Sequence, residues 1–140
     1  SNDLLLGVQY NLNEIQLGMG YQVAGSRNNN AITRLERGDD FLLRGGYYFG
    51  IDNLSITPQL LVIKRLSESS VLDTTSTEEN FVYVEGSDQL QINFLLNAEY
   101  KFTKSTGLVF EFAFPFLKRE VNVDGLTRAL TLSLGLLWHF

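Results

Sequence analysis

The sequence predicts an all-β protein built from seven antiparallel strands. Apolar and polar residues alternate with a period of two in segment after segment, the pattern of a strand with one apolar face. No stretch shows the period of an amphipathic helix. Short and long connections also alternate strictly along the chain, so all the tight turns are expected at one end of the sheet.

The strongest alternation lies in the C-terminal half. In Leu90–Phe102 every even position is apolar, and most of the odd positions are polar. The same pattern repeats with Leu108 to Phe116 and with Leu130 to Phe140. The other expected strands are 4–10, 15–23, 41–49 and 54–65. Most of these segments are long enough to cross a bilayer when tilted, which takes about 9 to 11 residues.

The connections divide into two classes. Tight turns are expected at 11–14, 50–53 and 103–106, where Asn, Gly, Asp and Ser suit hairpin geometry. The connections at 25–40, 67–89 and 118–127 are long and polar, and we expect them to be the outer loops. Nothing divides the chain further, so residues 1–140 are interpreted as one β-barrel domain or a portion of one.

Composition removes several classes of function. The formal charge is −5, so no basic excess exists to neutralise phosphates, and nucleic-acid binding has no electrostatic basis. The absence of cysteine excludes disulfides and thiolate metal sites. A single histidine excludes a metal site with several His ligands. No apolar run approaches the 18 residues of a transmembrane helix.

Alternation alone fits a soluble up-and-down barrel as well as a membrane barrel. The polar face favours the membrane barrel, because it carries amides, hydroxyls, glycines and few charges, unlike an ordinary solvent face. Aromatic residues also gather at the tight-turn end of the apolar face, as in the girdle at a membrane interface. The expected girdle comprises Tyr10, Tyr47, Phe49, Tyr100, Phe102, Trp138 and Phe140.

The C-terminal segment Leu-Ser-Leu-Gly-Leu-Leu-Trp-His-Phe140 resembles the last strand of Gram-negative outer-membrane β-barrel proteins. Phe114-Pro-Phe-Leu through Asp124-Gly-Leu is similar to the closing hairpin of transporter-like barrels of the MetA pathway of phenol degradation. Segment 54–64 instead resembles PorP/SprF-type barrels. These resemblances imply an antiparallel transmembrane β-barrel in the bacterial outer membrane, in contact with lipid and lipopolysaccharide and inserted by the barrel-assembly machinery through its C-terminal strand.

The implied function is a passive channel or transporter of small solutes, without a cofactor. The alternatives are a non-transporting barrel that anchors a surface or secretion complex, and a soluble ligand-binding barrel. Seven strands are an odd number, whereas single-chain bacterial barrels normally have an even number. We therefore expect the C-terminal part of a larger barrel or one share of an oligomeric barrel. Segment 80–86 could instead add a short eighth strand.

Alternation assigns six titratable side chains to the inner, polar face: Arg44, Arg65, Glu99, Lys101, Glu111 and His139. Glu99 and Glu111 flank one tight turn, so they should lie opposite or diagonal to each other, and two close carboxylates require a cation. Arg44 is expected to supply it. The interpretations are an ionic network that stiffens the barrel, a selectivity feature, or a carboxylate pair of a hydrolase.

Two other features support no catalysis. His139 is expected at the membrane interface, far from carboxylates, so a Ser-His-Asp triad is disfavoured. The loop at 67–89 carries six acidic residues and no basic one, but no Ca²⁺-loop pattern, so a solvated loop is favoured over a cation site. The sequence therefore predicts no enzyme, no catalytic residue and no metal site.

Overall fold

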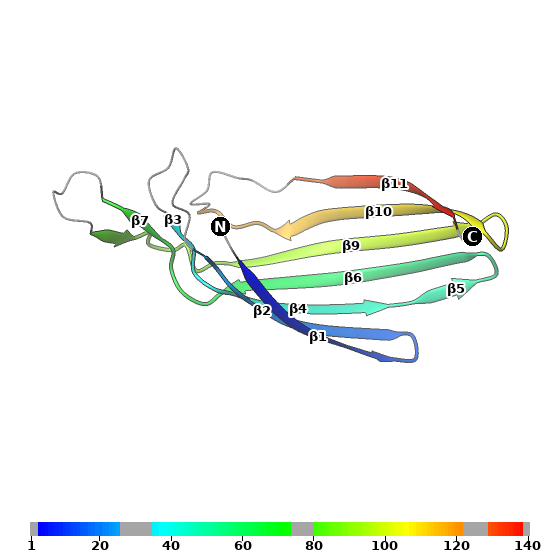
Figure 1. Ribbon diagram of the computed structural model, residues 1–140, viewed down its shortest axis with the longest axis horizontal. Helices are drawn as coiled ribbons and strands as arrows, with labels where there is room; N and C mark the ends of the chain where they lie inside the picture. Colours follow the sequence, from blue (N-terminus) through cyan, green and yellow to red (C-terminus); the bar gives the residue numbers. More distant parts are fainter. Residues whose placement is uncertain (1–2, 26–34, 74–79, 122–128, 139–140) are drawn as a thin grey trace.

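The computed structural model describes residues 3–25, 35–73, 80–121 and 129–138. Seven long strands form one antiparallel sheet in the order β1-β2-β4-β6-β9-β10-β11, as Figure 1 shows. Their bounds are β1 Leu4–Leu12, β2 Ile15–Val23, β4 Asp40–Tyr47, β6 Leu54–Arg65, β9 Leu90–Lys101, β10 Thr106–Leu117 and β11 Thr131–Trp138. A short β5 (Phe49–Ile51) also pairs with β6. The predicted all-β antiparallel fold with seven long strands is confirmed.

The tight turns lie at one end of this sheet, on the right in Figure 1. Asn13 and Asp52 adopt positive φ angles of 51° and 50°, which Asn and Asp tolerate better than most residues. The third turn is held by Thr103, whose Oγ1 accepts hydrogen bonds from the backbone N–H groups of Ser105 at 3.2 Å and Thr106 at 3.0 Å. The residues of the tight turns thus favour pairing between the two strands that each turn joins.

The predicted strand at 41–49 is interrupted. At Tyr48 the backbone N–H donates to the carbonyl of Glu14 at 2.7 Å, outside the regular ladder, so β4 ends at Tyr47 and β5 begins at Phe49. Other strand ends differ from the prediction by one or two residues, since β1 continues to Leu12 and β10 extends from Thr106 to Leu117.

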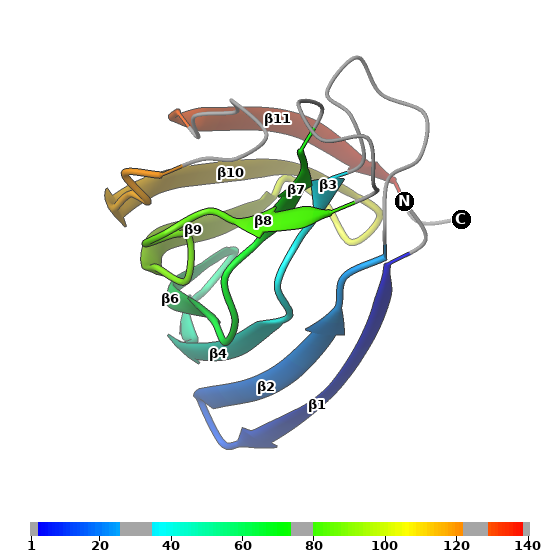
Figure 2. The ribbon, with the colours of Figure 1, turned by 90° about the vertical axis from the view of Figure 1, so that its left-hand side faces the viewer.

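A second, three-stranded sheet lies at the opposite end and consists of β3 (Leu35–Glu36), β7 (Ser70–Leu72) and β8 (Phe81–Tyr83). Viewed from that end, these strands project inside the arc of the main sheet (Figure 2), and Figure 1 shows that they lie beyond its strand ends. The sequence predicted segments 25–40 and 67–89 as long loops, but parts of both segments form these short strands. β8 pairs with β7, so it is not an eighth strand of the main sheet.

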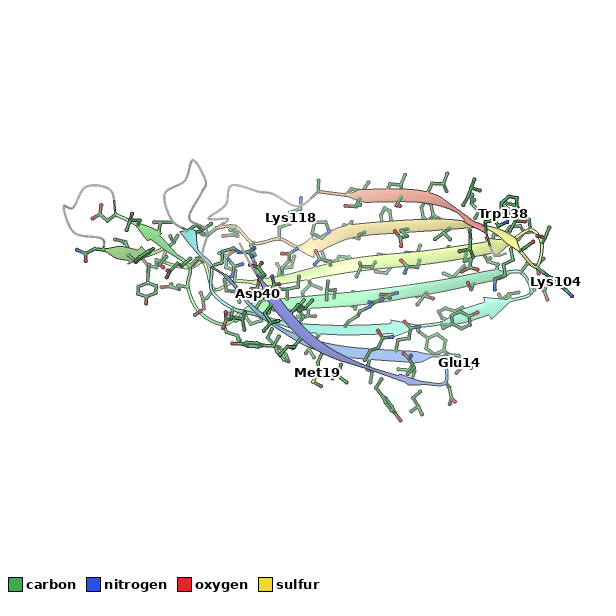
Figure 3. All side chains as sticks on the ribbon, viewed as in Figure 1. Glu14, Met19, Asp40, Lys104, Lys118 and Trp138 are labelled. Carbon is green, nitrogen blue, oxygen red and sulfur yellow. The ribbon has the colours of Figure 1, made fainter. Side chains whose placement is uncertain are left out.

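In an ordinary globular protein the apolar face of a sheet is buried, whereas in the main sheet the apolar face is exposed. On the outer, convex face almost every side chain of the long strands is apolar, and many of the largest are exposed, as with Leu134 at 68% and Leu136 at 85%. Side chains extend from both faces in Figure 3. The buried apolar core of the described residues contains only Leu35 and Ile63, at 3% and 7% exposed. Polar side chains occupy the inner, concave face.

The described strands do not close into a barrel. β1 and β11 form the two edges of the main sheet, and each pairs with a single described neighbour, β2 and β10 respectively. Figure 2 shows the sheet as an arc with its open side between these two strands. The fold is therefore a strongly curved antiparallel sheet, and the predicted barrel closure is not seen among the described residues.

Candidate functional site

The concave face encloses an open hollow of about 660 Å³, which we call the central hollow. It is lined by side chains from all seven long strands, together with three glycines of β1 and β2. Its charged lining residues are Arg44 of β4 and Glu111 of β10. Its uncharged polar lining residues are Gln9, Gln59, Asn97, Thr131 and Ser133. The rest of the lining is largely apolar and includes Leu42, Leu61 and Leu95. The hollow therefore offers hydrogen-bond donors and acceptors and one charge of each sign among apolar side chains.

Arg44 is held in the central hollow by Gln59, which lies on the neighbouring strand β6 and is only 4% exposed. The Arg44 Nε donates a hydrogen bond to Gln59 Oε1 at 2.6 Å. Gly46 lies directly opposite Gln59 in the sheet register, and a Cβ at Gly46 would lie only 2.9 Å from Gln59 Cγ. Glycine at this position thus leaves the space that Gln59 occupies while it orients the guanidinium.

The predicted pairing of Arg44 with an acid is wrong. Among the described residues no ion pair joins Arg44 to Glu99 or Glu111. The register explains this difference, because Arg44 is level with Asn93 of β9, six residues from Glu99 along that strand. Six residues span about 20 Å at about 3.3 Å each, well beyond the reach of an arginine side chain. Alternation predicts the face on which a side chain lies but not which residues of neighbouring strands lie level with it.

Glu99 and Glu111 occupy the expected diagonal arrangement. Glu99 lies opposite Val109, and Glu111 lies opposite Asn97, so they are offset by two residues across β9 and β10. The cation near Glu99 is Lys101 of the same strand, whose Nζ lies 3.6 Å from Glu99 Oε1. Both ionised side chains are solvent-accessible, so this pair contributes little stability.

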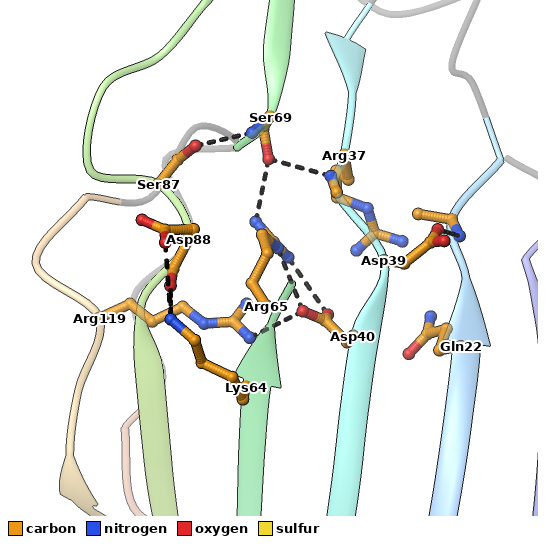
Figure 4. Close-up of polar contacts among 12 residues, drawn as sticks. Gln22, Arg37, Asp39, Asp40, Lys64, Arg65, Ser69, Ser87, Asp88 and Arg119 are labelled. Atoms are coloured by element: carbon orange, nitrogen blue, oxygen red, sulfur yellow. Dashed lines mark hydrogen bonds and ion pairs between the residues drawn. The ribbon is translucent and has the colours of Figure 1, made fainter. Parts of the chain in front are cut away.

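The end of the sheet with the long connections contains a buried polar group, which we call the loop-end cluster. It comprises Asp40, Arg65, Ser69, Ser87 and Arg119 (Figure 4). Asp40 Oδ1 accepts from Arg65 Nε at 3.1 Å and from Arg119 Nη2 at 3.0 Å, while its Oδ2 accepts from Arg65 Nη2 at 3.3 Å. One carboxylate thus neutralises parts of two guanidinium groups drawn from β6 and from the segment after β10.

Two fully buried serines extend the loop-end cluster into the small sheet. Ser69 Oγ accepts hydrogen bonds from Arg65 Nη1 at 3.2 Å and from the backbone N–H of Gly38 at 3.3 Å. The backbone N–H of Ser69 in turn donates to Ser87 Oγ at 2.7 Å. The cluster therefore ties the start of β4, the end of β6 and both flanks of the β7–β8 hairpin together. Arg65 was predicted on the inner face, and it belongs to this cluster.

Burial changes along the inner face. Toward the long connections, Ile63, Gln91 and Asn93 are buried. Toward the tight turns, Lys101 and Glu111 are exposed. The concave face is therefore packed at one end and open along the rest of its length.

The aromatic residues predicted as a girdle lie at the tight-turn end of the outer face and are exposed, apart from Phe140, which with His139 lies outside the described residues. Tyr47 and Phe49 have ring centroids 4.6 Å apart, and Tyr100 and Phe102 have centroids 5.4 Å apart. The sequence analysis did not single out a second group on β9 and β10, in which Phe94 lies 6.1–6.5 Å from Phe112, Phe114 and Phe116.

Within the described ranges no group of three His, Cys, Asp or Glu side chains could hold a metal ion. Of the acidic loop, Glu68 accepts from the backbone N–H of Gly86 at 2.9 Å and Asp88 lies 3.6 Å from Lys64 Nζ, while Glu78 and Glu79 lie outside the described residues. No helix in the described part of the chain is long and apolar enough to cross a membrane.

Sequence reasoning missed Gln59, Asp40 and Arg119. Alternation places Gln59 and Asp40 on the inner face, yet neither residue type alone indicates a partner, and Arg119 lies in a loop where alternation says nothing. Compared with known proteins, the chain matches no family model, no curated protein and no solved structure.

Proposed function

We propose that this chain forms part of a transmembrane β-barrel in the bacterial outer membrane and acts as a passive channel or transporter of small solutes. The observation that supports this is the inverted distribution of side chains: the convex face is apolar and exposed, and the polar and charged side chains lie on the concave face, together with leucines such as Leu61 and Leu95. An exposed apolar surface this extensive is very unfavourable in water and suits the hydrocarbon of a bilayer. The exposed aromatic residues at the tight-turn end suit its headgroup region.

The face assignment is tested by a pair of substitutions on adjacent residues of β11. Leu134 lies on the outer face and Ser133 lines the central hollow. Leu134→Arg should lower the free energy of unfolding in lipid vesicles by roughly 2–4 kcal/mol, whereas Ser133→Arg should change it far less. Urea titration of the vesicle-inserted protein measures both. Similar small effects of the two substitutions would contradict a lipid-facing convex surface.

The membrane proposal also requires partners for the edges of the sheet, because unpaired strand edges do not occur in the hydrocarbon region. Seven successive antiparallel strands leave β1 and β11 running in the same direction. An odd number of additional strands between them would keep every pair antiparallel. These strands would belong to the same polypeptide or to further protomers, and the particle mass in detergent distinguishes the two cases.

Channel activity is tested by conductance in planar bilayers, where stepwise ion currents are expected. A bilayer that stays sealed at all voltages would favour the second candidate, a non-transporting barrel that anchors a surface or secretion complex. The packed loop end favours this alternative, because the loop-end cluster is buried and the small sheet lies beyond the same end of the main sheet.

Insertion into the membrane is proposed to depend on the C-terminal strand, which resembles the signal read by the barrel-assembly machinery. Deleting Phe140 should lower assembly in cells, measured by heat-modifiable gel mobility, far more than it lowers refolding into detergent. Equal small losses in both assays would count against recognition of this strand.

A further inference from the structure

The central hollow has a charge pattern that points to a class of solute. Its two charged lining residues, Arg44 and Glu111, carry opposite signs, and both are exposed. Neither forms an ion pair with another described residue. Lys101 and Glu99, by contrast, form an ion pair with each other near the tight turns. The hollow therefore presents one cation and one anion that are available to a bound molecule.

Arg44 is positioned for an anionic group. Its Nε is engaged by the buried Gln59, and no described residue is hydrogen-bonded to its two Nη atoms, which are the donors that grip a carboxylate. The absence of a side chain at Gly46 preserves this arrangement, because a Cβ there would displace Gln59. A carboxylate in the hollow would therefore meet a guanidinium that is already oriented.

The spacing of the two charges sets the length of the molecule. Arg44 and Glu111 lie three strands apart, about 14 Å across the sheet, and four residues apart in register, about 13 Å along it. The curvature of the sheet and the length of both side chains shorten the gap that a solute must bridge. A single amino acid is too short for this gap, whereas an extended chain of three residues reaches about 10 Å.

The lining between and beside the two charges offers polar groups to a peptide backbone. Between the two charges, β6 and β9 contribute the amides of Gln59 and Asn97 together with the apolar Leu61 and Leu95. Gln9 on β1 and Thr131 and Ser133 on β11 flank the charges and can both donate and accept hydrogen bonds. We propose that the central hollow binds short zwitterionic peptides, with the peptide carboxylate at Arg44 and the peptide ammonium toward Glu111. This inference rests on the proposed role of the concave face as a solute lumen and specifies the solute class.

The test is calorimetric titration of the detergent-refolded protein with three matched probes. Triglycine carries both terminal charges, N-acetyl-triglycine only the carboxylate, and triglycine amide only the ammonium. Triglycine should bind about tenfold or more tightly than either singly charged probe, since each lost contact is a hydrogen bond to a charged group. Equal binding of all three, or no binding of any, would overturn the inference.

Two variants assign the charges. Arg44→Gln should reduce the affinity for triglycine to that for triglycine amide, and Glu111→Gln should reduce it to that for N-acetyl-triglycine. Both side chains are exposed, but Arg44→Gln also removes the hydrogen bond to Gln59, so circular dichroism verifies that each variant keeps the fold. The matched control is Glu99→Gln, an acid of the same face outside the lining of the hollow, which should leave the affinity unchanged.

The outcomes separate this inference from the proposed function. A protein that passes the Leu134→Arg and Ser133→Arg comparison but shows no zwitterion preference remains a membrane barrel without a peptide site. A protein that fails that comparison yet binds triglycine through Arg44 and Glu111 retains the peptide site and loses the membrane assignment.

Discussion

The two ends of the concave face are built from the same strands and differ in how their polar groups are satisfied. At the loop end, charged and hydroxyl groups are buried and contact one another, as in the Asp40, Arg65 and Ser69 network. Toward the tight turns, the Glu99–Lys101 pair and Glu111 remain accessible. The difference indicates that the described parts of the long connections form a packed cap at one end, while the rest of the concave face remains available to water and solutes.

The largest effect should follow from breaking the loop-end cluster at Asp40. Asp40→Asn keeps the shape of the side chain but leaves Arg65 and Arg119 buried without their carboxylate, which should cost roughly 3–5 kcal/mol in the free energy of unfolding. Urea titration measures this loss. Asp88→Asn is the matched control, because Asp88 is half exposed and pairs with Lys64 at 3.6 Å, so its loss should be below about 1 kcal/mol. Equal losses would show that the cap is not buried in solution.

The next largest difference in stability is expected when a methyl group is added to a glycine of the packed cap rather than to a glycine of the open concave face. A Cβ at Gly38 would lie 1.9 Å from the carbonyl oxygen of Ser67 in the packed cap, so Gly38→Ala must move the backbone and should cost about 1–3 kcal/mol or more. Gly135→Ala on the concave face of β11 is the control, since its nearest neighbour would be 4.0 Å away. Thermal unfolding followed by circular dichroism compares the two variants. A stable Gly38→Ala variant would contradict the close packing of the cap.

A smaller effect is expected where the concave face is open. Lys101→Gln removes the partner of Glu99, but both side chains remain accessible to water, so the change in unfolding free energy should be about 0–1 kcal/mol and should diminish in high salt. Titration at low and high ionic strength measures it. A loss as large as that of Asp40→Asn would remove the contrast between the two ends.

The smallest effect concerns pH at the rim of the cap. The Tyr21 hydroxyl donates to Asp39 at 2.7 Å and the Ala24 N–H donates to it at 3.0 Å, so the pKa of the Asp39 carboxyl lies below its ordinary value of 3.8. A lowered pKa in the folded protein adds stability above pH 3.8 that is lost as the pH falls through the folded value. Tyr21→Phe should reduce this acid-dependent part of the stability, measured by unfolding at pH 3 and pH 6. An identical pH dependence with and without the hydroxyl would refute the assignment.

Sequence reasoning reached the main sheet because its determinants are local. Period-two alternation in β9, β10 and β11 defines the faces, and turn residues such as Asn13 define the hairpins. It did not reach the small sheet, because strands of two or three residues such as β3 and β7 are too short to show a period.

The sequence predicts which charged residues lie on the concave face, but not which residues they contact. The face of Arg44, Glu99 and Glu111 follows from parity, whereas the partner of Arg44 depends on how β4 and β6 are aligned across an interrupted strand. The loop-end cluster joins Asp40 to Arg119, 79 residues away, through loops in which no pattern records the contact. Long-range polar contacts of this kind are fixed by tertiary packing.

The position of the loop-end cluster also affects how the chain reaches its final arrangement. Each hairpin can form early because its two strands are joined by a few residues, but Asp40, Arg65 and Arg119 meet only after β4, β6, β9 and β10 are aligned. Asp40 and Arg65 are also direct cross-strand partners, so sliding β6 along β4 by one residue would turn Arg65 to the opposite face. We therefore expect the cluster to form late in folding and to stabilise only the correct register of β6 against β4.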